Sequence, residues 1–232
     1  TRVGFESTYS ILYYRTPPTD EFNVRSMELP GFCPIAPTEK QLLHRRHIKT
    51  QDLKVEGDFL TARRTILMND DIRVGIAKVN KPAQHWFNNV EGDECWFAYD
   101  GGGTLESVYG ILPFKKHDYV IVPKGTPYRL HPDNDRGTFL VFESSTYIDV
   151  PKQFRNESGQ ITMDAPFCHR DFRVPTEMLR YDARRHGAGP HPLIVKYANQ
   201  LSVHEFKHFP WELAGWDGAV YPVAFYIHDY QP

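Results

Sequence analysis

The sequence has no long hydrophobic run and almost no net charge. No stretch approaches the roughly 18 uncharged apolar residues of a membrane-spanning helix, and residues 1–4 do not begin a signal peptide. The 27 basic and 29 acidic side chains leave a net charge of −2, which gives no general attraction to nucleic acid or to anionic membranes. We therefore expect a cytoplasmic protein whose partner is a small molecule or another subunit.

Cysteine is also scarce. Cys33, Cys95 and Cys168 are odd in number and far apart in the sequence. This pattern is typical of reduced thiols that pack in a core, in a reducing compartment, and it argues against a disulfide framework.

Helical periodicity is hard to find, and 18 prolines work against long helices. The sequence instead has short β-branched and aromatic runs between clusters of Gly, Pro, Asn and Asp, which supply tight turns. This rhythm predicts an all-β meander. The predicted strands are 63–68, 72–79, 94–99, 104–109, 119–122, 128–131 and 138–144, and the turns between them include 69–71, 100–103 and 133–137.

Proline content separates the ends of the chain from its middle. The first segment, residues 1–43, is an extended arm that we expect to pack on a neighbouring surface. The third is a proline-rich excursion with a short helix predicted over 176–181, directly after Pro175. The predicted segments are the arm 1–43, the barrel 44–150, the excursion 151–210 and the strand region 211–232.

A final strand is predicted over residues 221–230 because apolar side chains recur at every second position. Tyr221, Val223, Phe225 and Ile227 fall on one side, and Ala224, Tyr226 and His228 fall on the other. We expect one of these two faces to be buried against the barrel. We expect its second edge to be unpaired within this chain and to meet a further barrel.

One motif suggests a particular fold. Residues 94–101 (ECWFAYDG) and 122–128 (VPKGTPY) resemble the acidic, glycine and proline skeleton of a cupin barrel, a small β-barrel that usually holds a metal on histidines. The fold expected from this resemblance is all-β, a cupin-like barrel or jelly roll.

The histidines of a cupin are missing. The two positions before Glu94 are occupied by Asn88 and Val90, or in the other register by Phe87 and Asn89, and Tyr128 occupies the position of the later histidine. These side chains are not the imidazole and carboxylate set that holds Fe(II) or Zn(II). We therefore predict a degenerate barrel that binds no metal.

The chain as a whole resembles the amino-terminal half of homogentisate 1,2-dioxygenases, in order from about residue 44 to the end. Several separate motifs in the right order are more specific than one glycine motif. The matching segments are 67–71 (LMNDD), 92–94 (GDE), 103–107 (GTLES), 118–129 (DYVIVPKGTPYR), 155–160 (RNESGQ), 168–171 (CHRD) and 215–230 (GWDGAVYPVAFYIHDY).

The resemblance implies a two-barrel enzyme that opens the ring of homogentisate with O2 to give maleylacetoacetate, in tyrosine and phenylalanine catabolism. It implies Fe(II) on two histidines and a glutamate of a second barrel, which we expect to lie beyond this chain. It also implies trimers paired into hexamers. No catalytic residue is then expected in this chain, and His228, Tyr226 and Tyr221 are the residues predicted nearest the substrate.

Other histidine groups have weaker interpretations. His44 and His47 lie three apart, but two arginines stand between them. His204 and His208 lie in a strand-like alternation, so a solvated or capping role is favoured. A triad of His85, Glu94 and His131 does not fit the cupin spacing, and His228 is more often a hydrogen-bonded interface histidine than a functional one.

Three functions remain open from the sequence. The first is a piece of a homogentisate 1,2-dioxygenase whose catalytic barrel lies elsewhere. The second is a non-catalytic cupin that binds a small ligand or another subunit. The third is a metal-free enzyme, such as an isomerase, that uses Glu94, His131 and tyrosines as acid and base. The ordered match over most of the chain favours the first.

Overall fold

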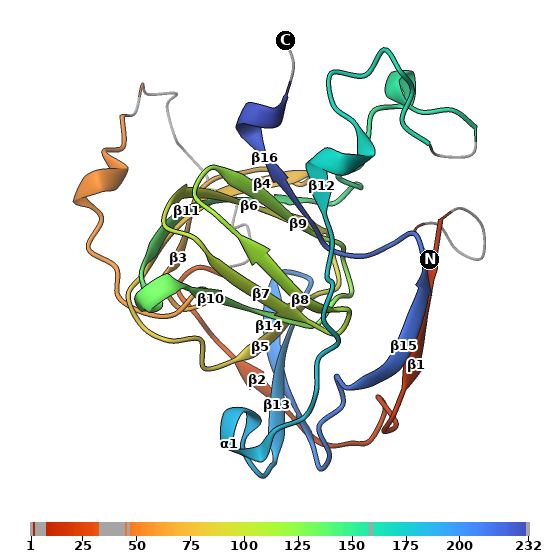
Figure 1. The fold of residues 1–232 in the computed structure, drawn as a ribbon. Coiled ribbons are helices and arrows are strands. Elements are labelled where there is room, and N and C mark those ends of the chain that lie inside the picture. Colours follow the sequence, from red (N-terminus) through yellow and green to blue (C-terminus); the bar gives the residue numbers. More distant parts are fainter. Residues whose placement is uncertain (1, 3–7, 33–44, 46, 158–159, 231–232) are drawn as a thin grey trace.

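Two β-sheets pack face to face in the computed structural model, which describes residues 2, 8–32, 45, 47–157 and 160–230 (Figure 1). Within these residues each sheet has seven strands, and we name the sheets after strands β6 and β10. The β6 sheet has the order β12 (Phe172–Arg173), β16 (Val223–Tyr226), β9 (Asp118–Val122), β6 (Asp93–Asp100), β11 (Gly137–Ser144), β4 (Ile72–Val79) and β3 (Arg63–Met68). The β10 sheet has the order β2 (Glu21–Met27), β14 (Gln200–Phe206), β13 (His191–Tyr197), β5 (Trp86–Asn89), β10 (Tyr128–Pro132), β7 (Gly103–Ser107) and β8 (Gly110–Phe114).

The remaining elements lie around this sandwich. A separate antiparallel ribbon pairs β1 (Ser10–Tyr14) with β15 (Leu213–Gly218) beside the two sheets (Figure 1). The short helices are η1 (Thr50–Asp52), η2 (Asp133–Asp135), η3 (Lys152–Phe154), η4 (His169–Asp171), α1 (Ala183–His186) and η5 (Ile227–Asp229). None of the helices in the described residues is long and apolar enough to cross a bilayer.

The all-β prediction is confirmed, and the seven predicted strands correspond to β3, β4, β6, β7, β9, β10 and β11. The turn at 69–71 joins β3 to β4, where the Asn69 side chain accepts hydrogen bonds from the backbone N–H groups of Asp71 and Ile72. Over the described residues the two sheets form a cupin-like jelly-roll sandwich and do not close into one continuous barrel.

The main core lies between the sheets because alternate residues of each strand point inward. Its largest fully buried side chains include Phe59, Phe87, Trp96, Tyr128 and Phe139. A second core covers the outer face of the β10 sheet. It consists of Trp86, Val108, Tyr109, Leu179, Leu193, Phe206, Phe209, Trp211 and Leu213.

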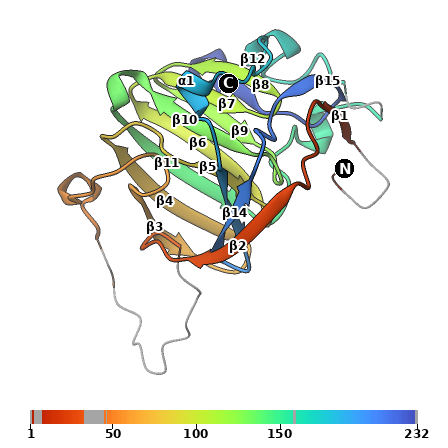
Figure 2. The same ribbon diagram turned by 90° about the horizontal axis from the view of Figure 1, so that it is seen from below.

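The predicted arm is not separate from the rest of the chain where the structure describes it. Strand β1 pairs with β15, and β2 pairs with β14 at the edge of the β10 sheet, which is seen from below in Figure 2. Strand β2 nevertheless remains largely exposed, so packing of the arm on a neighbouring surface stays a prediction. The predicted excursion also contributes to the sandwich, because β13 pairs in parallel with β5.

The predicted helix over residues 176–181 is absent. Glu177 forms an isolated bridge with Ile111 of β8, and the backbone N–H of Ile111 donates to the Glu177 carbonyl at 2.8 Å. Leu179 two residues later is fully buried in the second core. Hydrogen bonding to a strand edge and burial of Leu179 thus outweigh the helix-start signal after Pro175.

The final strand is shorter than predicted and its edges are paired. Strand β16 runs over Val223–Tyr226, and η5 replaces the rest of the predicted strand. It pairs with β9 on one side and with β12 on the other. Its fully buried residue is Ala224, while Val223 and Phe225 are half-buried and Ile227 is exposed. The predicted length and the predicted open edge are therefore wrong, and the buried face is the one that carries Ala224.

Candidate functional site

The acidic residue of the cupin motif lies in the centre of the sandwich. Glu94 of β6 and Tyr128 of β10 face each other across the interior, and the Tyr128 hydroxyl donates to Glu94 Oε2. Arg63 of β3 approaches from the side, with Nη1 2.5 Å from Glu94 Oε1. The indole N–H of Trp96 donates to the Tyr128 hydroxyl oxygen at 3.1 Å. The side chains of Arg63 and Glu94 are only 4% and 1% exposed.

The ion pairs continue from this point toward the sheet edge. Arg63 Nη2 lies 3.1 Å from Glu143 Oε2 of β11, and Arg73 Nη1 lies 3.0 Å from the other oxygen of Glu143. The Lys196 ammonium of β13 donates to both Glu143 and Glu91. We call Arg63, Arg73, Glu91, Glu94, Tyr128, Glu143 and Lys196 the inner cluster. Its three cations balance its three carboxylates.

The electrostatics fix the protonation of the inner cluster. Burial, and then the charge of Glu94, raise the pKa of Tyr128 well above its ordinary value, so the hydroxyl remains a donor. Burial works against ionisation of Arg63, but Glu94 and Glu143 raise its pKa. Burial likewise favours a neutral Glu143, yet Arg63 and Lys196 lower its pKa. Glu143 is thus held as an acceptor and the Tyr128 hydroxyl as a donor, an arrangement that is unsuited to moving protons.

The structure decides between the two sequence registers. Phe87 is fully buried in the main core, whereas Asn88 lies next to Val195 of β13 on the side of the second core. Val90 follows the end of β5 and is 38% exposed. The interior position of the motif is therefore Phe87 and not Asn88 or Val90. The rings of Phe59, Phe87, Trp96 and Tyr128 contact one another and fill the space around Glu94.

A second buried carboxylate lies on the opposite face of β10. Glu106 of β7 accepts from Arg129 Nη2 at 2.6 Å and contacts His131 Nε2 at 3.2 Å. Arg185 Nη2 of α1 lies 2.8 Å from its other oxygen. The His186 ring is 3.6 Å from the same oxygen. We call Glu106, Arg129, His131, Arg185 and His186 the outer cluster. No sequence motif predicted it.

The outer cluster also holds its carboxylate ionised. Burial favours the neutral acid, but the hydrogen bond from His131 and the charge of Arg129 bring the pKa of Glu106 from 4.5 to about 2. The Arg129 guanidinium lies 4.8 Å from the centre of the Trp86 ring. Burial lowers the pKa of His186, although Glu106 opposes this.

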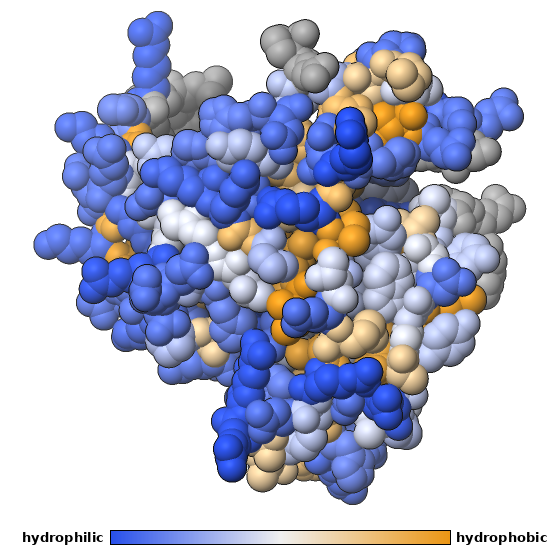
Figure 3. Space-filling model, in the orientation of Figure 1, coloured by the Kyte–Doolittle hydropathy of each residue, from blue (hydrophilic) through white to orange (hydrophobic). Residues whose placement is uncertain are grey.

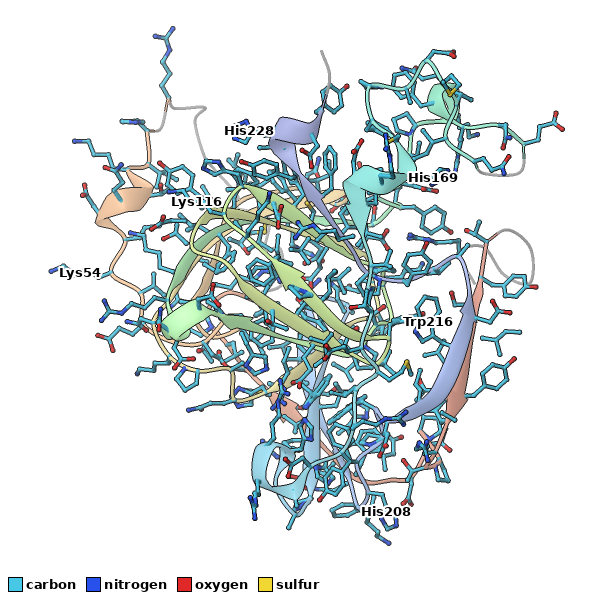
Figure 4. All side chains as sticks on the ribbon, viewed as in Figure 1. Lys54, Lys116, His169, His208, Trp216 and His228 are labelled. Carbon is cyan, nitrogen blue, oxygen red and sulfur yellow. The ribbon has the colours of Figure 1, made fainter. Side chains whose placement is uncertain are left out.

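The predicted triad of His85, Glu94 and His131 is not brought together. His85 Nδ1 lies 3.2 Å from Asp58, His131 belongs to the outer cluster, and Glu94 to the inner cluster. His204 contacts Ser202 and Glu21 from β14, which agrees with the predicted strand. Figure 4 places His208, His169 and His228 in separate regions of the surface. His44 lies outside the described residues.

Two of the three residues predicted near a substrate share one surface. His228 is exposed in η5, with Nε2 3.1 Å from Nδ1 of His117. Tyr226 packs beneath the Lys115 ammonium, which lies 3.6 Å from the ring centre. His117 and Lys115 were missed from the sequence, where the only signal is a basic turn (KKHD) between β8 and β9.

Tyr221 lies elsewhere, beside Trp216 at a ring distance of 5.1 Å. It borders a cleft of about 330 Å³. The aromatic side chains in the wall of this cleft are Phe167, Phe172, Tyr221, Phe225 and Tyr230. The hydropathy surface in Figure 3 shows apolar side chains gathered in the region of β12 and β16 and along the second core. The structure thus separates Tyr221 from His228 and Tyr226.

Comparison with known proteins gives a family for this arrangement. Residues 45–227 match the family described as homogentisate 1,2-dioxygenase N-terminal. The chain belongs to this family. It is 30% identical over 232 residues to a protein of Saccharolobus solfataricus named as a dioxygenase, covering 99% of this chain and 57% of that protein. It is 23% identical over 150 residues to homogentisate 1,2-dioxygenase of Rhodopseudomonas palustris, covering 64% of this chain and 31% of that enzyme.

This member of the homogentisate 1,2-dioxygenase N-terminal family thus spans little more than half of one curated relative and matches less than a third of the other. Solved structures with similar parts include a cupin-2 domain protein of Shewanella frigidimarina, with a TM-score of 0.32, 15% identity and coverage of 35% of this chain and 78% of that one. Another is salicylate 1,2-dioxygenase of Pseudoaminobacter salicylatoxidans, with a TM-score of 0.29, 13% identity and coverage of 38% and 28%.

The cupin resemblance of this family member implies a metal, and the motif residues do not fit one. Glu94 has one oxygen on a guanidinium and the other on a phenol, and the register position next to it is the apolar ring of Phe87. A metal centre needs several imidazole, thiolate or carboxylate donors around one point. In the part of the chain that the structure describes, no group of three or more His, Cys, Asp or Glu side chains is arranged to hold an ion.

Proposed function

We propose that this chain is the amino-terminal portion of a ring-cleaving dioxygenase that acts on homogentisate with O2. The observation that carries the proposal is the family match over residues 45–227. The two curated relatives, both named as dioxygenases, support the proposal. In this proposal Fe(II) is bound by residues outside these 232, and the chain forms a folded, non-catalytic half of the enzyme.

The inner cluster supports a structural role for the described sandwich. Glu94 is already paired with Arg63 and Tyr128, and aromatic rings occupy the space that a substrate would need. A metal-free isomerase that uses Glu94 and His131 is disfavoured, because these residues lie in different clusters on opposite faces of the β10 sheet. A cupin that binds a small ligand between the sheets is also disfavoured, because aromatic side chains already fill this space.

We further propose that the surface of His117, Tyr226 and His228 contacts the catalytic part of the enzyme. In this proposal His228 and Tyr226 lie near the substrate, and Tyr221 does not. The exposed imidazole of His228, beside the half-buried rings of His117 and Tyr226, is suited to a polar interface. The proposed setting is cytoplasmic, in a homo-oligomer of trimers paired into hexamers. Light scattering of the purified protein measures that assembly.

The test compares the protein of natural length with residues 1–232 expressed alone. We expect stoichiometric iron and O2 consumption with homogentisate in the longer protein, and neither in the 232-residue chain. A dihydroxybenzoate that lacks the acetate arm serves as the substrate control. Ring cleavage by the 232-residue chain would overturn the division of labour, and a longer protein that opens only the control substrate would overturn the homogentisate assignment.

A further inference from the structure

The positive charge at the centre of the sandwich comes from a side chain of the protein, Arg63. Arg63 of β3 projects into the main core, and its two terminal nitrogens contact carboxylates of two different strands, Glu94 on β6 and Glu143 on β11. The group is enclosed on its faces as well, with the Phe32 ring centre 5.2 Å and the Trp96 ring centre 5.7 Å from its central carbon. Two carboxylates and two aromatic rings thus surround one buried cation.

The local backbone is built to seal this position. The segment Leu29–Phe32 crosses β3, and a Cβ atom at Gly31 would lie 2.5 Å from the Arg63 carbonyl oxygen. Only glycine allows the segment to approach this closely and to place the Phe32 ring against the guanidinium. The cation is therefore covered from the side on which solvent would otherwise reach it.

The cluster needs a cation there. Without Arg63, Glu94 would keep only the Tyr128 hydroxyl and Glu143 would keep Arg73 and Lys196, so a carboxylate would be buried without a counter-charge. Burying an unpaired carboxylate is far more costly than burying a balanced, hydrogen-bonded pair. A guanidinium fits because it is always charged and bridges two carboxylates in fixed directions.

We propose that the Arg63 guanidinium is a built-in cation that replaces a metal ion at the motif carboxylate, so that this sandwich folds and remains folded without any metal. Glu94 stands at the acidic position of the motif, Tyr128 at the position of its later histidine, and Arg63 supplies the positive charge between the sheets. The inference is independent of the ring-cleaving activity, because it concerns the stability of this half of the molecule alone.

The first test uses hydrogen exchange in the protein of natural length, read from peptides of β6 and β10. Arg63→Met removes the charge and keeps much of the length, and we expect exchange protection in both strands to fall at least tenfold. Arg64→Met is the matched control, because among the described residues the Arg64 guanidinium donates to the backbone carbonyls of Thr61 and Arg63 and to no carboxylate. Equal protection in Arg63→Met and wild type would overturn the proposal.

A charge-balanced variant covers the case in which Arg63→Met does not fold. Arg63→Met combined with Glu94→Gln removes both members of the pair, and we expect the double variant to recover most of the lost protection. A double variant that is no better protected than Arg63→Met would overturn the proposal, because the loss would then come from packing.

Two further measurements separate a built-in cation from a bound metal. In Arg63→Ala, we expect millimolar methylguanidinium to restore protection of β6 and β10, and tetramethylammonium to have no effect. In the wild type, we expect a chelator to leave the protection of these two strands unchanged. Loss of protection with the chelator, or a folded Arg63→Ala protein that methylguanidinium does not restore, would contradict the proposal.

Discussion

The two faces of strand β10 carry the same chemistry in different surroundings. Tyr128 points inward to Glu94, and Arg129 points outward to Glu106, and both carboxylates are almost completely buried. Among the described residues, the partners of Glu94 are Arg63 and Tyr128, and both are buried. The outer carboxylate, Glu106, is paired with Arg185, whose side chain is 50% exposed and so also contacts solvent. The arginine–glutamate pair on the inner face of the strand is therefore closed to solvent, and the one on the outer face is in contact with it.

This difference indicates which cluster can tolerate the loss of a charged partner. A buried ion pair is costly to break because the remaining charge has no water to replace its partner. At the outer cluster, Arg185 and His131 can turn toward solvent when their partner changes. We therefore expect the inner cluster to act as a structural unit and the outer cluster to attach the α1 segment to the sandwich in a pH-dependent manner.

The largest expected effect is at the inner cluster. Glu94→Ala leaves Nη1 of Arg63 and the Tyr128 hydroxyl without their acceptor, and we expect the free energy of unfolding to fall by about 3–5 kcal/mol. Urea denaturation followed by circular dichroism measures the change. Glu56→Ala is the control, because this side chain is 75% exposed in its pair with Lys81. Similar losses for the two variants would remove the distinction between sealed and exposed carboxylates.

The next effect is the pH dependence of the outer cluster. The pKa of Glu106 falls from 4.5 to about 2 on folding, so its stabilisation is fully present above pH 4.5 and is lost as the pH falls toward 2. We expect Glu106→Gln to cost on the order of 3 kcal/mol at pH 7 and almost nothing near pH 2. Urea denaturation across this range measures it. A difference that does not vary with pH would contradict the assigned cause.

A smaller effect is expected from Tyr128→Phe, which keeps the ring in the main core. The substitution removes the hydrogen bond to Glu94 and leaves the Trp96 indole N–H without its acceptor. We expect a loss of about 1–2 kcal/mol in the free energy of unfolding. An unchanged stability would indicate that Arg63 alone satisfies Glu94.

The smallest effect is expected at the solvent side of the outer cluster. Arg185→Ala removes a half-exposed partner of Glu106, and we expect at most about 1 kcal/mol of lost stability. Limited proteolysis across residues 181–190 should still accelerate, because α1 loses an attachment to β7. A loss as large as that of Glu94→Ala would show that the outer cluster is as sealed as the inner one.

Much of the sandwich could be predicted from the sequence because its strands are local patterns. The hairpin of β3 and β4 and the strands β6, β9, β10 and β11 follow from alternating side chains and turn residues. Strand β13 was assigned to an irregular excursion because its proline-rich surroundings hide the pattern. Its pairing with β5 joins residues more than 100 positions apart, which a local pattern does not reveal. The final strand was overextended because alternation continues into η5.

The candidate site was predicted only in part, for the same reason. Glu94 and Tyr128, the two motif positions named from the sequence, contact each other in the interior. No local pattern indicates that Arg63, which comes before the motif, would contact them, because this contact depends on where β3 packs in the sandwich. Phe87 and Asn88 correspond to two registers that differ by one residue, and alternation of side chains alone does not decide which one faces the interior. His117 was missed because a basic turn is usually only solvated surface.

The central claim is that Glu94 binds a guanidinium and not a metal, and the metal content of Glu94→Gln in the protein of natural length tests it most directly. The account predicts that the folded variant keeps the wild-type iron content and rate of ring cleavage, as does the Glu106→Gln control. Loss of iron from a folded Glu94→Gln protein, with iron retained in Glu106→Gln, would contradict the account and make Glu94 a metal ligand.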